Sequence, residues 1–352
     1  MFMLVVEFPP FASALDADND YLNQKEVIMK PVLLVQGVER IDEVPRLAEL
    51  EARAEIRFAT TVDELRAALP GADALLGWNF RADNLQQAWD RADRLRWIHW
   101  GGAGVDAAMF PELVASPVQL TNARGVFDRP MAEWVLGIIL CFAKRIPDTL
   151  ASQARASWDY RMSETVAGKR ALVVGVGSIG RAVGRLLRAA GMEVEAIGRR
   201  ARDGGEDFSR IHASGDLHAR LPLADYVILI TPLTEQTRNL FGAAEFDAMA
   251  AHARFVNIGR GALVVEAELL RALEQGQIAG AALDVFVEEP LPADSPFWRA
   301  PNCIVSPHVS GDYVEYQAAM ADQFIDNWAR FAAGEPLRNL VDKQLGFVPG
   351  TD

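Results

Sequence analysis

Three charged residues each follow an apolar run in the second half of the chain. Arg260 follows RFVNIG, Glu289 follows ALDVFVE and His308 follows CIVSP. Such runs predict parallel strands, whose carboxyl ends meet at one edge of a sheet, so we expect the three side chains to converge. A carboxylate holds the tautomer of an imidazole and favours its protonated form, and an arginine anchors an acid substrate. The sequence therefore predicts a catalytic group for acid–base chemistry.

The other four histidines are weaker candidates. His212 and His218 lie in the polar stretch SRIHASGDLHAR and are expected to face solvent. His252 precedes an apolar run, where a packed or surface role is favoured over catalysis. His99 alternates with tryptophans in an apolar run and is expected to be a core imidazole. His308 is thus the candidate for proton transfer near neutral pH.

A glycine motif marks a second functional segment. Gly175, Gly177 and Gly180 form GVGSIG with Ser178 and Ile179, directly after the run ALVV and before the helical pattern RAVGRLLRAAG. The first glycine permits a tight turn, the second lets the backbone approach a pyrophosphate, and the third lets helix and strand pack closely. Backbone N–H groups and the helix dipole then face the anion. The alternative is a tight turn without a ligand.

The next apolar run indicates which dinucleotide binds. EVEAIG ends at Gly198, where an acidic residue would bind the ribose hydroxyls of NAD, and Arg199 and Arg200 follow. Two guanidinium groups without a carboxylate suit a 2′-phosphate, so NADPH is the expected cofactor and NADH is less favoured. The alternative is two solvated surface arginines.

The elements that position these residues form two series of apolar runs separated by helical patterns, which predicts an α/β protein with two doubly wound parallel sheets. Thr61 and Glu64 form a capping box that starts a helix. Further helices are expected from Pro130 to Pro147 and within residues 314–334. The expected strands are VLLVQG (32–37), EIRFAT (55–60), ADALLGW (72–78), RWIHWGG (96–102), VQLTN (118–122), ALVVGVG (171–177), EVEAIG (193–198), YVILITP (226–232), RFVNIGRG (254–261), GAALDVF (280–286) and CIVSPH (303–308).

We expect a Rossmann-type dinucleotide-binding domain over residues 126–311, inserted into a flavodoxin-like substrate domain. The substrate domain is then discontinuous, with residues 29–125 joined by residues 312–352. Residues 1–28 are expected to be an N-terminal extension, because Met29-Lys30-Pro31 precedes the first strand like a natural start. Hinges are expected where the chain crosses between the domains.

Composition excludes several classes of protein. The 352 residues suit about two domains. A net charge of −13 disfavours nucleic-acid binding. Cys141 and Cys303 cannot build a disulfide framework, and no metal-ligand spacing is present, so we expect no metal and a reducing, cytoplasmic location. No apolar run reaches the ~18 residues of a membrane span, and the first residues lack the basic region of a signal peptide.

These motifs together resemble the D-2-hydroxyacid dehydrogenase family over residues 31–345. The missing acidic residue and the two arginines are similar to its NADPH-dependent glyoxylate/hydroxypyruvate reductase branch. The matching segments are GAGVD (102–106), NARGVFDRPMAEW (122–134), GVGSIG (175–180), TPLTEQT (231–237), NIGRGALV (257–264), ALDVFVEEP (282–290) and SPHVSG (306–311).

The resemblance implies a role for each candidate residue. Arg260 would bind the substrate carboxylate and polarise the carbonyl. His308 would be the general acid and would also contact the cofactor, and Glu289 would pair with His308. Asp284 would lie near the nicotinamide amide. The backbone amides of two further residues would hold the substrate carboxylate, and five others would contact the cofactor. These are Ala103 and Gly104 for the substrate, and Thr231, Pro232, Thr237, Ile258 and Gly259 for the cofactor.

Trp78 either narrows the substrate pocket for a small keto acid or packs in the core. The resemblance also implies a homodimer with residues 131–146 as the interface helix, although a helix buried within one chain would have the same sequence pattern. The expected reaction is NADPH-dependent reduction of a small 2-keto acid to the D-2-hydroxy acid. The alternatives are another 2-hydroxyacid specificity, a dinucleotide-sensing corepressor-like protein, or formate or phosphite oxidation, and formate chemistry needs no proton donor.

Overall fold

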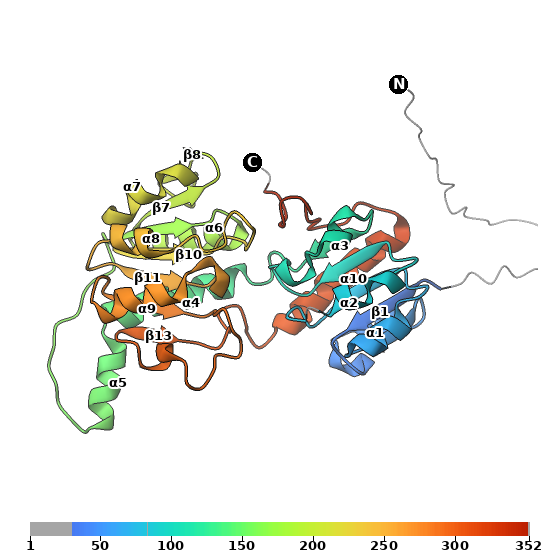
Figure 1. Cartoon of the computed structure of the whole chain (residues 1–352), viewed down its shortest axis with the longest axis horizontal. Helices are drawn as coiled ribbons and strands as arrows, with labels where there is room; N and C mark the ends of the chain where they lie inside the picture. Colours follow the sequence, from blue (N-terminus) through green and yellow to red (C-terminus); the bar gives the residue numbers. More distant parts are fainter. Residues whose placement is uncertain (1–29, 83, 351–352) are drawn as a thin grey trace, which may run out of the picture. The chain divides into compact units, whose positions relative to one another are not determined.

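The first sheet is built from the chain immediately after the N-terminal region. The computed structural model describes residues 30–82 and 84–350, so the expected extension over residues 1–28 lies outside the described residues (Figure 1). Five parallel strands pair in the order β2-β1-β3-β4-β5, the flavodoxin-like order that was expected. The strands are β1 Val32–Gln36, β2 Glu55–Ala59, β3 Ala74–Gly77, β4 Trp97–Trp100 and β5 Gln119–Asn122.

Local sequence signals and a distant helix complete this layer. The capping box is present, because Thr61 accepts a hydrogen bond from the Glu64 amide while Glu64 accepts from the Thr61 amide. The last helix returns to this sheet, where Phe324 stacks on Trp97 with ring centroids 5.4 Å apart. The helices are α1 Val62–Ala68, α2 Leu85–Ala88, α3 Pro111–Ala115 and α10 Tyr316–Ala333.

His99 is a core imidazole, as expected. It is 1 % exposed on β4, and its Nδ1 lies 2.8 Å from the hydroxyl of Thr121. Burial lowers the pKa of His99 to about 3, because the charged form would lose its hydration. The folded protein therefore holds His99 neutral at pH values where the unfolded chain binds a proton.

This burial predicts a loss of stability in acid. Below the unfolded pKa of about 6.5, protonation of His99 in the unfolded chain favours unfolding, and the loss continues down to the folded value. From pH 7 to pH 5, the free energy of unfolding of the parent should fall about 2 kcal/mol further than that of His99→Leu. Urea unfolding at both pH values measures the difference, and equal losses in the two proteins would contradict it.

The second sheet has eight strands in the order β13-β12-β11-β10-β6-β7-β9-β8, all parallel except for the β8–β9 pair. Six of them are the expected second series. The strands are β6 Arg170–Val174, β7 Glu193–Gly198, β8 Arg202–Asp203, β9 Arg210–Ala213, β10 Tyr226–Leu229, β11 Arg254–Asn257, β12 Gly280–Leu283 and β13 Cys303–Val305.

The expectation that His212 faces solvent was wrong. His212 lies on β9, its side chain is 14 % exposed, and Nε2 lies 3.2 Å from a carboxylate oxygen of Glu195. The sequence pattern does not indicate this strand, because its residues are mostly polar and only Ile211 provides an apolar side chain for the core. The side chains of His218 and His252 are mostly exposed, at 55 % and 65 %.

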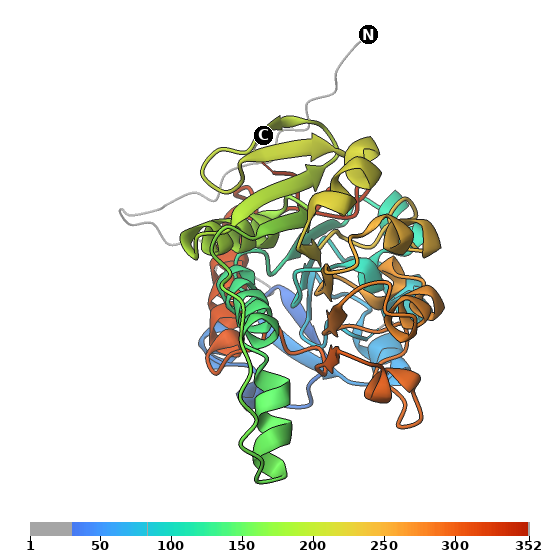
Figure 2. The ribbon, with the colours of Figure 1, turned by 90° about the vertical axis from the view of Figure 1, so that its left-hand side faces the viewer.

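Helices cover both faces of the eight-stranded sheet. Leu172 and Val174 belong to one apolar cluster, with residues of α8 and α9, while Ala171 and Val173 belong to another, with residues of α4 and α6. Figure 2 shows the green helices and the orange helices on opposite sides of the strands. The helices are α4 Asp128–Ala143, α5 Ile146–Ala154, α6 Ser178–Ala189, α7 Leu217–Arg220, α8 Ala243–Ala248 and α9 Glu266–Glu274.

The long helix expected from Pro130 to Pro147 is two helices. The chain breaks between α4 and α5 at Arg145, whose φ of 52° is left-handed. Val135 and Ile139 of α4 are fully buried, in the same cluster as Val183 and Leu187 of α6. This packing favours the alternative of a helix buried within one chain for the α4 part of residues 131–146.

The chain passes twice between the elements of the two sheets. The first connection runs from β5 to α4 and the second from β13 to α10. The predicted domain boundaries, 125/126 and 311/312, fall within these two connections. None of the helices within the described residues has both the length and the apolar character that a membrane span needs.

Candidate active site

Three neighbouring strands of the eight-stranded sheet carry the predicted catalytic residues. Arg260 follows β11, Glu289 follows β12 and His308 follows β13. The strands pair in parallel in that order, so their carboxyl ends lie along one edge. Asp284 lies at the same edge, because it directly follows β12. The topology thus gives these residues the common edge that the sequence predicted.

His308 and Glu289 form a direct pair. Nδ1 of His308 lies 2.7 Å from Oε2 of Glu289, and the other carboxylate oxygen accepts a hydrogen bond of 2.9 Å from the Phe286 amide. The side chains are 21 % and 28 % exposed. His308 has a left-handed φ of 56°, an uncommon conformation for a residue with a side chain. Because Glu289 holds Nδ1, Nε2 is the nitrogen that can face a substrate.

Glu289 is ionised at neutral pH. Burial raises the pKa of Glu289, but hydrogen bonds from His308 and from the Phe286 amide outweigh burial, so the pKa lies below its usual range. A carboxylate at this distance from Nδ1 fixes the orientation of the imidazole. The pair can therefore supply a proton.

Arg260 lies against the GAGVD loop. Its Nε donates to both carboxylate oxygens of Asp106, at 3.0 and 3.2 Å, and its Nη1 donates to the Gly259 carbonyl at 2.8 Å. A Cβ at Gly104 would collide with Nη2, so a side chain there would displace the guanidinium of Arg260 from this position. Nη2 thus lies beside the backbone that was expected, with Ala103, to hold a substrate carboxylate. Sequence reasoning missed Asp106, although the quoted motif contains it.

Phe80 and Arg81, which follow β3, also contact His308. Arg81 donates from Nη2 to the His308 carbonyl at 3.1 Å, and the Phe80 ring lies 6.3 Å from the imidazole in an edge-on arrangement. Both were missed, because nothing local in their sequence indicates a contact more than 220 residues away. Trp78 is 9 % exposed within an apolar cluster, which favours the packing alternative for that residue.

Asp284 holds the loop that carries His308. It is fully buried and accepts hydrogen bonds from the Ser306 hydroxyl at 2.6 Å and from the amides of Val309 and Ser310, both at 2.9 Å. Three donors in this compact loop fix the backbone on both sides of His308. The expected contact of Asp284 with the nicotinamide amide stays a prediction.

The glycine motif has a shape that fits a pyrophosphate. Gly175 has a φ of 123°, and a Cβ at Gly180 would collide with the Gly175 carbonyl. No atom lies within 4 Å of the position that a Cβ would take at Gly177, which precedes α6 and makes no side-chain cap. The first N–H groups of α6 are therefore available to an anion. Ser178 begins α6 and donates its hydroxyl to Asp128 at 3.0 Å, and Ile179 follows it.

The other predicted cofactor residues follow neighbouring strands. Gly198 ends β7, and Arg199 and Arg200 after it are exposed. The loop after β10 is closed on itself, because the Thr237 hydroxyl donates to the Pro232 carbonyl at 2.7 Å. The same loop begins with Thr231, and Ile258 and Gly259 follow β11. These roles stay predictions.

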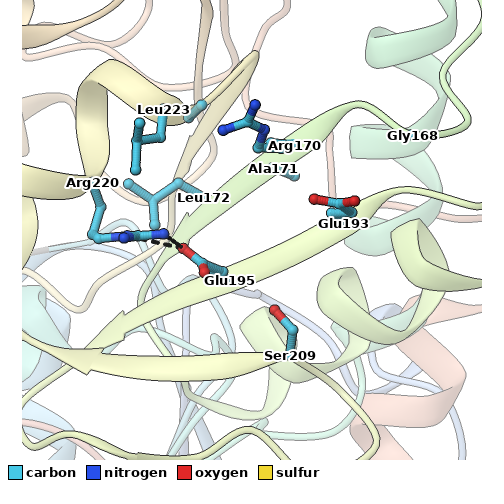
Figure 3. Close-up of a pocket in the computed structure, with 10 residues that line it drawn as sticks. Gly168, Arg170, Ala171, Leu172, Glu193, Glu195, Ser209, Arg220 and Leu223 are labelled. Carbon is cyan, nitrogen blue, oxygen red and sulfur yellow. Dashed lines mark hydrogen bonds and ion pairs between the residues drawn. The ribbon is translucent and has the colours of Figure 1, made fainter.

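A separate cavity of about 310 Å³ lies on the eight-stranded sheet (Figure 3). It is lined by Arg170, Glu193, Glu195 and Arg220, near the beginnings of β6 and β7, and by none of the predicted site residues. Glu195 and Arg220 pair with each other across it. Among the described residues, no cluster of His, Cys, Asp or Glu side chains could hold a metal ion.

Comparison with known proteins identifies the family. Residues 136–310 match the model of the D-isomer specific 2-hydroxyacid dehydrogenase, NAD binding domain. The chain is 32 % identical over 325 residues to a glyoxylate/hydroxypyruvate reductase B of Citrobacter koseri, covering 90 % of this chain and 99 % of the relative. The chain belongs to the D-2-hydroxyacid dehydrogenase family.

Solved structures of the family agree with the fold. An NADPH-dependent glyoxylate/hydroxypyruvate reductase of Sinorhizobium meliloti, in complex with NADP and sulfate, has a TM-score of 0.79 at 29 % identity and covers 90 % of this chain and 100 % of that one. A D-isomer specific 2-hydroxyacid dehydrogenase of Xanthobacter autotrophicus Py2, in complex with NADPH and MES, has a TM-score of 0.77 at 30 % identity, with 91 % and 100 % covered. The expected family and fold class are confirmed.

Proposed function

We propose that this protein reduces a small 2-keto acid of the glyoxylate or hydroxypyruvate type to the D-2-hydroxy acid, with NADPH as the reductant. The observation that carries the proposal is the 2.7 Å pair of His308 and Glu289 on the sheet edge that also carries Arg260. The family relatives named as glyoxylate/hydroxypyruvate reductases, and those solved with NADP or NADPH, support the substrate class and the cofactor.

Each residue has a separate part in the proposed reaction. When bound, the nicotinamide supplies the hydride. Protonated His308 donates the Nε2 proton to the carbonyl oxygen, and ionised Glu289 keeps the imidazole protonated and oriented. Arg260 binds the substrate carboxylate through Nη2, while Asp106 fixes its Nε. Arg260 and the backbone amides of the GAGVD loop then hold the substrate for proton transfer.

A substrate panel with both cofactors tests the proposal. We expect steady oxidation of NADPH with glyoxylate or hydroxypyruvate, measured as kcat/KM. Tight binding of the cofactor with turnover of no keto acid would contradict the enzyme and favour a dinucleotide sensor. Efficient oxidation of formate or phosphite without keto-acid reduction would contradict the proton-donor role of His308.

We also propose a cytoplasmic homodimer. The dimer is supported by the segment after α5, where Trp158, Tyr160 and Met162 are 98 %, 87 % and 83 % exposed. Several large apolar side chains exposed within one short segment favour an interaction site there. We therefore propose the segment after α5 as the interface, rather than α4, whose Val135 and Ile139 are buried in one cluster with residues of α6. The cytoplasmic location is supported by the free thiols of Cys141 and Cys303. Sedimentation at micromolar concentration tests the dimer, and a monomer would contradict it.

A further inference from the structure

The C-terminal segment after α10 is anchored on the five-stranded sheet. The Val341 amide donates to the Leu120 carbonyl of β5 at 2.8 Å. Lys343 is anchored through its ammonium group, which donates to three carbonyls at the end of α3 and just after it. These are the carbonyls of Leu113 at 3.0 Å, Ser116 at 2.6 Å and Val118 at 2.8 Å. These hydrogen bonds hold the beginning of the segment against β5 and α3.

The segment then closes into a loop that fixes Phe347. The Asp342 amide donates to the Phe347 carbonyl at 3.1 Å, and the Gly346 amide donates to the Asp342 carbonyl at 2.8 Å. Beyond the loop, Arg124 donates to the carbonyls of Val348 and Pro349, both at 3.1 Å. The backbone at Phe347 is therefore held from both sides along the chain.

Phe347 meets the segment predicted to choose the cofactor. The Cζ atom of Arg199 lies 5.1 Å from the centroid of the Phe347 ring. A Cβ at Gly346 would lie 3.7 Å from the methyl group of Thr234, in the loop after β10. The loop formed by residues 342–347 thus contacts the segment after β7 and lies close to the loop after β10. Arg200, next to Arg199, has no aromatic ring against it among the described residues.

The contact with Phe347 takes up no hydrogen-bond donor of Arg199, because the positive charge is attracted to the face of the ring. The guanidinium has five N–H donors. Arg199 can therefore donate hydrogen bonds to a phosphate while Phe347 restrains it. An exposed arginine loses much side-chain freedom when it binds a ligand, and a side chain that is already restrained loses less.

We propose that Phe347 is a specificity-determining residue for the cofactor, which orders Arg199 for the 2′-phosphate of NADPH. The proposal rests on the proposed function. It gives the C-terminal segment a role in the choice between the two dinucleotides, through Arg199 and independently of Arg200.

Binding of NADP⁺ and NAD⁺ to the full-length protein by calorimetry tests the proposal. A cation–π contact at an exposed site contributes about 0.5–1 kcal/mol, which is about 2- to 5-fold in affinity. We expect Phe347→Ala to weaken NADP⁺ binding by this factor and to leave NAD⁺ binding unchanged. Phe347→Tyr keeps a stacking ring and should keep the preference of the parent.

A double-mutant cycle separates this role from a structural one. In an Arg199→Ala background, Phe347→Ala should not change the preference further, while in the matched Arg200→Ala background it should have its full effect. An unchanged preference in Phe347→Ala, an equal loss of affinity for NADP⁺ and NAD⁺, or the full effect without Arg199 would each overturn the proposal. If the parent reduces glyoxylate but binds both dinucleotides equally, both the role of Phe347 and the proposed cofactor would be overturned. If the parent prefers NADP⁺ but reduces no keto acid, only the proposed reaction would be contradicted.

Discussion

Replacing His308 by alanine is expected to lower kcat for keto-acid reduction about 10²- to 10⁴-fold, the usual contribution of a positioned general acid. The carbonyl oxygen gains a proton during reduction, and His308 is the proposed donor. The change should lower kcat far more than it lowers the affinity for the dinucleotide, because the glycine motif follows a different strand, β6. Steady-state kinetics and a separate binding measurement distinguish the two effects.

His252→Ala is the matched control for this variant. His252 also lies beside a carboxylate, with Nε2 3.1 Å from Asp225, but its side chain is 65 % exposed and no predicted site residue contacts it. Removing this imidazole should leave kcat unchanged. A fully active His308→Ala protein would rule out the proposed proton donor.

The second large effect concerns the cofactor. A charge-assisted hydrogen bond contributes about 1.5–3 kcal/mol, and exposure of the two arginines keeps their joint contribution at about 2–3 kcal/mol. This corresponds to about a 30- to 150-fold preference of the parent for NADPH over NADH in kcat/KM. Arg199→Asp should reverse the preference, since a carboxylate repels the 2′-phosphate and accepts hydrogen bonds from the ribose hydroxyls of NADH.

The structure decides where the new carboxylate belongs. A Cβ at Gly198 would lie 3.0 Å from methyl groups of Ile211 and Val176, so an aspartate there would displace its neighbours, whereas Arg199 already has an exposed side chain. Arg210→Asp, an exposed position on β9, controls for the change in net charge. The parent's preference should also shrink as salt rises. Equal kcat/KM for the two cofactors at low salt would show that the arginines only face solvent.

The sequence best predicted the site residues that directly follow strands. Glu289 and His308 follow strongly apolar runs, and parallel pairing brings such positions together whatever the details of packing. Arg81 and Asp106 lack this signal, because their partners are 227 and 154 residues away in the chain. Only the folded chain brings these side chains together, so no local pattern reveals them.

The sequence also did not reveal the polar strand β9 or the contacts of the C-terminal segment. Strand β9 has one fully buried apolar residue, Ile211, and its strand geometry comes from pairing with β7. The break after α4 depends on the left-handed conformation of Arg145, which a helix-forming sequence does not indicate. The contact of Phe347 with Arg199 spans nearly 150 residues and has no periodic signal.

The pH dependence of kcat/KM for keto-acid reduction in the parent and in Glu289→Gln tests the paired proton donor most directly. The reaction needs protonated His308, so its rate falls as the pH rises and the imidazole loses its proton. Without the negative charge of Glu289, this fall should begin at lower pH. An unchanged pH profile in Glu289→Gln would contradict the role of the carboxylate.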